Sequence, residues 1–194
     1  MTLDPISELS TAQRQLIALV TGGATFAQIA AHPENRLQPD SVRSAIDAVL
    51  AITGTRTPAH LAAWATARRL VTEPVRPSGA LIVTPALPPR RQQVLCGWAG
   101  GKSNEELAHE LGITRSTVRG YGKALIADLD VGCARQAVVV GVLSGLVLLR
   151  DVDPSWPAKP LVAEAAPVSG ARIRRLTDNA TRRFPTKAPI PRQL

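Results

Sequence analysis

One pattern of apolar residues and glycines occurs twice along this chain of 194 residues. When the sequence is aligned with itself at an offset of 78 positions, Gly22-Gly23 coincides with Gly100-Gly101. Further along, Val42-Arg43 coincides with Val118-Arg119, now at an offset of 76 positions. Self-similarity of this kind indicates two copies of one supersecondary unit, with two extra residues in the middle of the first copy.

The composition favours helices for both copies. Hydrophobic residues make up 45% of the chain and aromatic residues only 3%, so a core must consist of aliphatic side chains. Such a core is more typical of small helical units than of an aromatic-rich β-sandwich. We therefore predict an all-α protein of two tandem four-helix units.

Proline and charge divide the chain further. We expect a first unit at residues 1–74, a proline-rich linker at 75–86, a second unit at 87–150 and a basic tail at 151–194. The tail is rich in proline, alanine and arginine, which cannot bury a core, and we expect it to be disordered. Two roles are open for this tail: a basic arm that lies along phosphates, or a segment that only increases solubility.

The charge of the whole chain indicates a polyanionic partner. The formal net charge is +8 and the pI is about 10.7, values that favour nucleic acid. The N-terminus lacks a basic segment followed by an apolar one, and the longest apolar run, 137–149, is too short to cross a bilayer. We expect a cytoplasmic, nucleoid-associated protein without a membrane partner.

Enzymatic chemistry is not expected. Cys96 and Cys133 form no disulfide framework, and the three histidines lack the spacing of metal ligands. No nucleophile is paired with a histidine, and no carboxylates are paired. The sequence therefore predicts neither metal nor cofactor.

Capping residues place the helices of the second unit. Gly100-Gly101 can end a first helix, and Ser103 with Glu106 forms a capping box that starts a second one. Gly112 ends this second helix, and Thr114 can cap a third. The two short helices and the tight turn between them predict a helix-turn-helix.

The third helix has a core face and a slender outer face. Val118, Leu125 and Leu129 point in one direction on a helical wheel. The opposite side carries Ser116, Gly120, Lys123, Ala124 and Ala127, flanked by Arg115 and Arg119. A ridge of small residues with flanking arginines suits a major groove about 12 Å wide. The alternative is an ordinary solvated face, weakened by about 1 kcal/mol at each of Gly120 and Gly122.

Several motifs of the second unit resemble the LuxR-type helix-turn-helix family of bacterial transcription regulators. They are the segments 87–95, 101–108, 111–114, 117–119 and 137–138. The resemblance implies that the third helix contacts the major groove, that the second helix begins at a phosphate, and that the fourth helix dimerises. The DNA contacts it implies are Ser103, Asn104, Thr114, Arg115, Ser116, Thr117, Arg119, Tyr121 and Lys123.

The first unit resembles the same family only weakly. Asp40 and Asp47 occupy the positions of Ser116 and Lys123, where carboxylates would repel phosphates. We hypothesise that this copy binds DNA weakly or not at all and serves as a docking or dimerising half. Weaker DNA contacts are expected from Arg43 and from the tail residues Arg172, Arg174, Arg175, Arg182 and Arg183.

Each unit ends in an apolar fourth helix. Thr57-Pro58 begins the first of these helices, and the second is expected over residues 137–149. A helix that is apolar all round is buried on more than one face, so a partner surface is expected. That partner is either the sister helix of the same chain or another copy of the chain. The expected interface residues are Leu61, Trp64, Val139, Val142, Leu143 and Leu146.

Together these features predict a sequence-specific double-stranded DNA-binding protein, a bacterial transcription regulator that self-associates through its fourth helices. One alternative is a DNA-binding assembly factor of the packaging, partition or nucleoid type. Another is an adaptor that docks on RNA polymerase or another regulator without contacting DNA itself.

Overall fold

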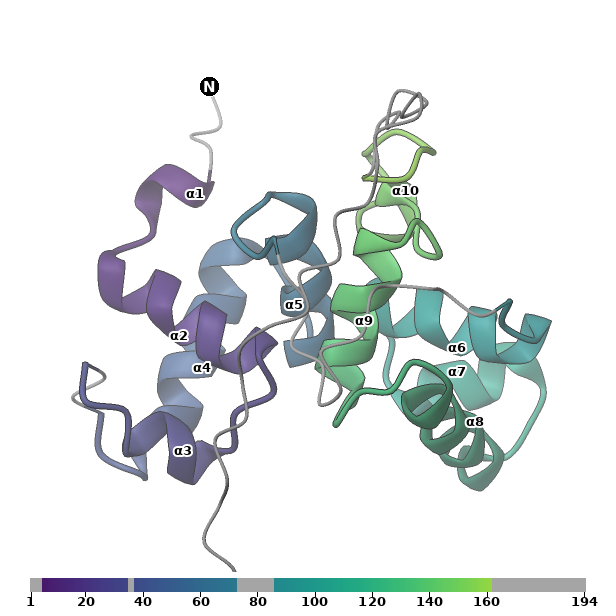
Figure 1. Cartoon of the computed structure of the whole chain (residues 1–194), viewed down its shortest axis with the longest axis horizontal. Coiled ribbons are helices and arrows are strands. Elements are labelled where there is room, and N and C mark those ends of the chain that lie inside the picture. The colour runs from purple at the N-terminus through teal and green to yellow at the C-terminus, as the bar shows by residue number, and fades with distance from the viewer. Residues whose placement is uncertain (1–4, 35–36, 73–85, 162–194) are drawn as a thin grey trace, which may run out of the picture. The chain divides into compact units, whose positions relative to one another are not determined.

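The computed structural model describes residues 5–34, 37–72 and 86–161. In these ranges the chain forms ten helices and no strand, which confirms the all-α fold class (Figure 1). None of the helices in the described ranges is both long and apolar enough to span a bilayer. The described residues belong to one compact unit.

The helices fall into two halves along the sequence. The first half, residues 5–72, contains α1 (Pro5–Glu8), α2 (Thr11–Thr21), α3 (Phe26–Ala30), α4 (Ser41–Thr53) and α5 (Pro58–Ala67). The second half, residues 86–161, contains α6 (Pro89–Ala99), α7 (Asn104–Leu111), α8 (Arg115–Asp128), α9 (Ala134–Leu143) and α10 (Leu149–Val152).

Side-chain caps fix the starts of the principal helices. The hydroxyl of Ser103 accepts a bond from the Glu106 N–H, and the Glu106 carboxylate accepts one from the Ser103 N–H, at 3.2 and 2.7 Å. This reciprocal pair is the predicted capping box of α7. Thr114 caps α8 and Thr57 caps α5, also as predicted.

Two pairs of helices agree with the offsets of the sequence alignment, whereas α4 and α8 begin 74 positions apart. Helices α2 and α6 both have eleven residues and begin 78 positions apart, and α5 and α9 both have ten residues and begin 76 apart. Gly23 and Gly101 both have a positive φ, of 85° and 82°. The halves differ most at α3, which has five residues where α7 has eight. Pro33 follows α3, and a proline cannot continue a helix.

A single hydrophobic core joins the two halves. Helix α5 packs against α9, α5 also packs against α6, and α2 packs against α9 (Figure 1). The residues Leu61–Thr66 of α5 and Ala137–Val142 of α9 are buried without a break. The two predicted units therefore share one core and do not form separate domains on either side of a linker.

The end of the second half differs from the sequence prediction. The sequence predicts a fourth helix that runs to residue 149, but α9 ends at Leu143 because Gly145 adopts a left-handed conformation with φ of 74°. The chain then turns into α10, where Val152 is buried.

The predicted tail, residues 151–194, includes residues at its start that pack against the helices. Trp156 packs against the core, and the Arg68 guanidinium lies over its ring at 4.9 Å. Residues 151–161 are consequently part of the fold. The five arginines expected to contact DNA from the tail lie outside the described residues.

His60 gives the contact between α5 and α10 a pH dependence. Its Nδ1 accepts a bond from the Arg56 N–H at 3.2 Å, so its Nε2 carries the proton and donates to the Val152 carbonyl at 3.0 Å. Burial lowers the pKa of His60 from its ordinary value of 6.5, more than the Val152 carbonyl raises it. The folded state therefore takes up this proton less readily than the unfolded chain, and stability is lost as the pH falls below about 6.5.

We expect His60→Gln to remove this contribution while keeping both hydrogen bonds. Glutamine occupies the equivalent place in the second half, where Gln136 Oε1 accepts from the Gly132 N–H at 2.7 Å. Urea unfolding at about pH 7 and about pH 5 measures the effect, because titration of histidine falls in this range. The loss of stability between the two pH values should be smaller in the variant, and an equal loss would contradict this assignment.

Candidate nucleic-acid interface

Helix α8 presents the two faces predicted from the sequence. Val118, Leu125 and Leu129 are at most 1% exposed and belong to the core. At the start of the helix the Thr114 hydroxyl accepts from the Thr117 N–H at 3.1 Å. Thr114, Arg115 and Ser116 are exposed, so the N-terminal end of α8 lies at the surface, where its partial positive charge favours an anion.

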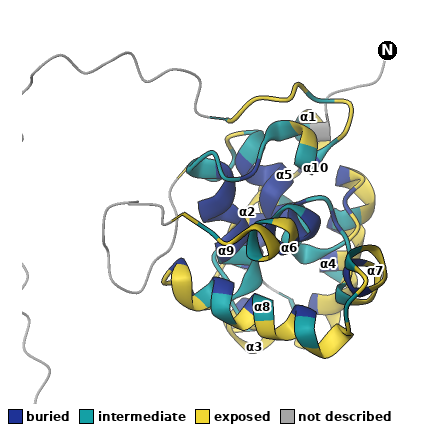
Figure 2. Ribbon diagram, turned by 90° about the vertical axis from the view of Figure 1, so that its right-hand side faces the viewer, coloured by how far each residue is buried: buried dark blue, intermediate teal, exposed yellow. Residues whose placement is uncertain are grey.

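The outer face of α8 is exposed (Figure 2), and three cationic side chains lie on it. Its exposed residues include Arg115, Ser116, Arg119, Gly120, Lys123 and Ala127. In the part of the chain that the structure describes, none of these three cations forms an ion pair, whereas Arg91 pairs with Asp128 and Lys102 with Glu110. No carboxylate of the described residues pairs with these three cations, so their charge is available to a polyanion.

The other predicted contact residues are less free. The Ser103 hydroxyl is engaged in the cap of α7, and Asn104 Oδ1 accepts from Trp98 Nε1 at 3.0 Å. The amide nitrogen of Asn104 can still donate to a phosphate at the start of α7. Thr117 and Tyr121 are half-buried, and Tyr121 packs against the core. These residues suit a supporting role beside the exposed cations.

The equivalent face of α4 has a different charge. Asp40 precedes the helix without forming a side-chain cap, and Asp40, Arg43 and Asp47 are all exposed. By the alignment, Asp40 stands at the position of Ser116 and Asp47 at that of Lys123, and only Arg43 matches a cation of α8, Arg119. This face is therefore a poor match for a phosphate backbone.

The residues predicted for a dimer or inter-repeat interface lie mostly inside the chain. Leu61, Trp64, Val139 and Val142 are buried in α5 and α9. Leu143 and Leu146, in and just after the last turn of α9, are half-buried. Because α5 and α9 pack against each other within one chain, Leu61, Trp64, Val139 and Val142 are already covered there.

The two glycines of α8 have different surroundings, which the sequence alone did not distinguish. A Cβ on Gly120 would meet no heavy atom within 4 Å. A Cβ on Gly122 would lie 2.8 Å from the Trp98 ring. Gly122 therefore allows α8 to approach α6 closely, while Gly120 only lowers the helix propensity of the exposed face.

We expect opposite effects from alanine at these two positions. Gly120→Ala should stabilise the fold by about 0.5–1 kcal/mol, because alanine loses less conformational entropy in a helix. Gly122→Ala should destabilise it by about 1–3 kcal/mol, because the buried Trp98 ring must move. Chemical denaturation of both variants measures this, and equal signs would show that the packing of Gly122 against Trp98 is not a constraint.

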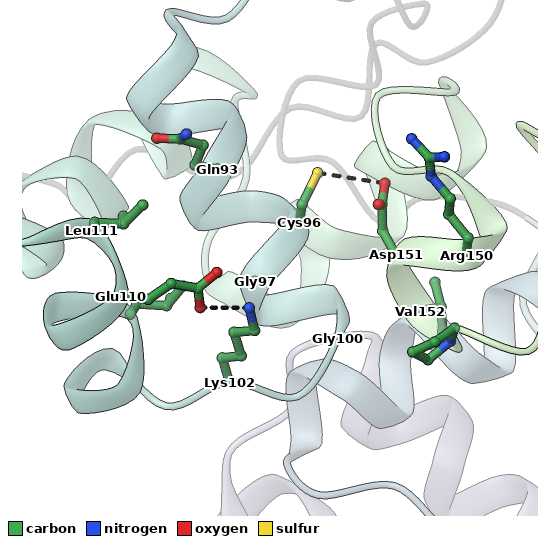
Figure 3. Close-up of a pocket in the computed structure, with 12 residues that line it drawn as sticks. Gln93, Cys96, Gly97, Gly100, Lys102, Glu110, Leu111, Arg150, Asp151 and Val152 are labelled. Carbon is green, nitrogen blue, oxygen red and sulfur yellow. Dashed lines mark hydrogen bonds and ion pairs between the residues drawn. The ribbon is translucent and has the colours of Figure 1, made fainter. Parts of the chain in front are cut away.

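A surface pocket between α6, α7 and α10 is a second candidate site that the sequence analysis did not identify (Figure 3). Cys96 points toward Asp151, with the thiol 3.6 Å from the carboxylate, and Lys102 pairs with Glu110 across from it. Burial raises the pKa of Cys96 to about 12, so this sulfur is a neutral thiol and a poor nucleophile. The described residues contain no cluster of three or more metal-ligating side chains.

The comparison with protein families agrees with the motifs of the second half. Residues 85–140 match the family described as bacterial regulatory proteins, luxR family. The chain thus carries a LuxR-type helix-turn-helix region, formed by α6, α7, α8 and most of α9. No curated protein and no solved structure matches the chain. The match is confined to these residues, and that family is one of bacterial regulatory proteins.

Proposed function

We propose that this protein is a sequence-specific double-stranded DNA-binding regulator of transcription and that α8 is the helix that enters the major groove. The observation that carries the proposal is the exposed face of α8, where the three cations around Ser116 and Gly120 form no ion pair with any described residue. Because a side chain is absent at Gly120, the backbone can approach base edges, while Arg115 and Arg119 reach bases or phosphates. Ser103 and Asn104 at the start of α7 hold a phosphate.

Selection of bound duplexes from a random pool, with the full chain as bait, tests this proposal. Enrichment of one short motif supports sequence-specific recognition. Salt-sensitive binding without enrichment would favour a DNA-binding assembly factor, since contacts to phosphate alone carry no sequence information. Absence of binding even at low salt would favour an adaptor that docks on polymerase or another regulator.

We further propose that the first half does not itself bind DNA, because Asp40 and Asp47 stand where the second half has Ser116 and Lys123. The double variant Asp40→Asn/Asp47→Lys should raise affinity for nonspecific duplex by on the order of tenfold at low salt. Glu8→Lys/Ala12→Lys, at exposed positions of α1 and α2, adds the same three positive charges outside α4 and is the control for added charge. A double variant no tighter than this control would contradict the electrostatic explanation.

A further inference from the structure

We propose that the two halves of this chain pair with each other as two copies of a two-fold dimer would, so that the first half occupies the place of a second copy. The central contact is between α5 and α9. Their buried runs, Leu61–Thr66 and Ala137–Val142, coincide at the offset of 76 positions. Each half thus contributes the same segment to the contact, as in an isologous interface.

The flanking contacts between the halves are reciprocal. A Cβ on Gly101 would lie 2.6 Å from Nδ1 of His60, and a Cβ on Gly23 would lie 2.9 Å from Nε2 of Gln136. His60 is equivalent to Gln136 at the offset of 76, and Gly23 is equivalent to Gly101 at the offset of 78. The same two positions therefore meet twice, once in each direction, which is the signature of a two-fold relation.

The hydrogen bonds at these positions repeat as well. His60 accepts from the Arg56 N–H, and Gln136 accepts from the Gly132 N–H, four residues back in both halves. The Nε2 atom of each side chain donates a hydrogen bond to a backbone carbonyl of the opposite half. His60 Nε2 donates to the Val152 carbonyl at 3.0 Å, and Gln136 Nε2 donates to the Gly22 carbonyl at 2.7 Å. Only these acceptors differ.

This pairing leaves no place for a second chain on α9. A lone four-helix unit would expose one side of so apolar a helix and would need a partner there. Here the residues Ala137–Val142 are buried by α5, α2, α6 and α8 of the same chain. The pairing within the chain therefore replaces association between chains through the fourth helices.

The consequence for DNA rests on the proposed function. The pair offers two outer helices that are not equivalent, a cationic α8 and an α4 carrying Asp47 beside Arg43. A homodimer presents two identical helices to a palindromic site. A single chain of this protein instead presents one competent helix, so it recognises one non-palindromic half-site.

Sedimentation and thermal unfolding of the full chain test the pairing without DNA. We expect a monomer, with a melting temperature that changes by less than about 1 °C over a hundredfold range of protein concentration. A dimer whose melting temperature rises with concentration would overturn the pairing within one chain. Val139→Glu, on buried α9, should lower the melting temperature at every concentration, whereas Ile52→Glu, on the exposed side of α4, should not. If the wild-type protein were a dimer and the Val139→Glu variant a folded monomer, α9 would be an interface between chains, and the pairing within one chain would also be overturned.

The number of chains on a selected duplex tests the consequence. One chain per site and a single, non-palindromic half-site are the expected result. Two chains on a palindrome, with binding lost in Val139→Glu at a normal melting temperature, would overturn the inference and leave the proposed function standing. A monomer that binds no DNA would remove the proposed function and leave the pairing of the halves standing.

Discussion

Reversing the charges of Arg119 and Lys123 together should reduce affinity for a selected duplex by at least about a hundredfold. Both side chains are exposed on α8, and neither forms an ion pair within the described residues. A base-contacting arginine contributes about 1–3 kcal/mol, and a lysine at a phosphate adds a salt-dependent contribution. Two glutamates would also repel the duplex.

Fluorescence anisotropy with a labelled duplex measures this effect. Because both residues are exposed and outside the core, circular dichroism and the melting temperature should be unchanged. The matched control is Arg43→Glu, at the equivalent position of α4, which should change affinity by less than about threefold if α4 lies away from the DNA. Undiminished binding by a folded double variant would remove α8 from the interface.

Leu61→Ala should destabilise both halves of the protein by about 2–5 kcal/mol, the range for a leucine deleted from a packed core. Leu61 is fully buried in α5, and α5 packs against α2 of its own half and against α6 and α9 of the other. Loss of its side chain removes contacts from the core that the halves share. The helices of the second half should therefore unfold together with those of the first, in one transition.

Hydrogen exchange followed by mass spectrometry measures this for each helix separately. Ile52→Ala is the control, since Ile52 is 36% exposed on α4 and its truncation should cost within about 0.5 kcal/mol. If α6 and α8 keep their full protection in Leu61→Ala while α2 and α4 lose theirs, the halves are independent domains.

The local structure of the second half was predictable because it depends on neighbours in the sequence. The capping box of Ser103 and Glu106 and the cap at Thr114 join residues three positions apart, and such motifs are visible in a sequence. The core face of α8 follows from helical periodicity alone. The same periodicity predicts the cationic face opposite the core.

The partner of the fourth helices could not be predicted in this way. An apolar stretch such as Ala137–Val142 shows that more than one face is buried, but it does not show which surface buries each face. The choice between a sister helix and a second copy depends on contacts between α5 and α9, whose residues lie more than 60 positions apart in the sequence. The reciprocal contacts of His60 and Gln136 become visible only in the folded chain.

Two details of the second half also depend on distant contacts. Gly122 resembled a weak point of α8, and only the position of Trp98 shows that this glycine permits close packing. The segment from 151 to 161 resembled a tail because proline and charge dominate it. Its fold depends on one buried valine, Val152, and on the stacking of Trp156 with Arg68.

Hydroxyl-radical footprinting of the full chain, free and bound to a selected duplex, tests the central claim most directly. The account predicts protection of the outer face of α8 from Arg115 to Lys123 and of the start of α7 at Ser103 and Asn104. The equivalent face of α4 at Arg43 and Asp47 should remain as reactive as in the free protein. Protection of α4 with α8 left reactive would contradict the account.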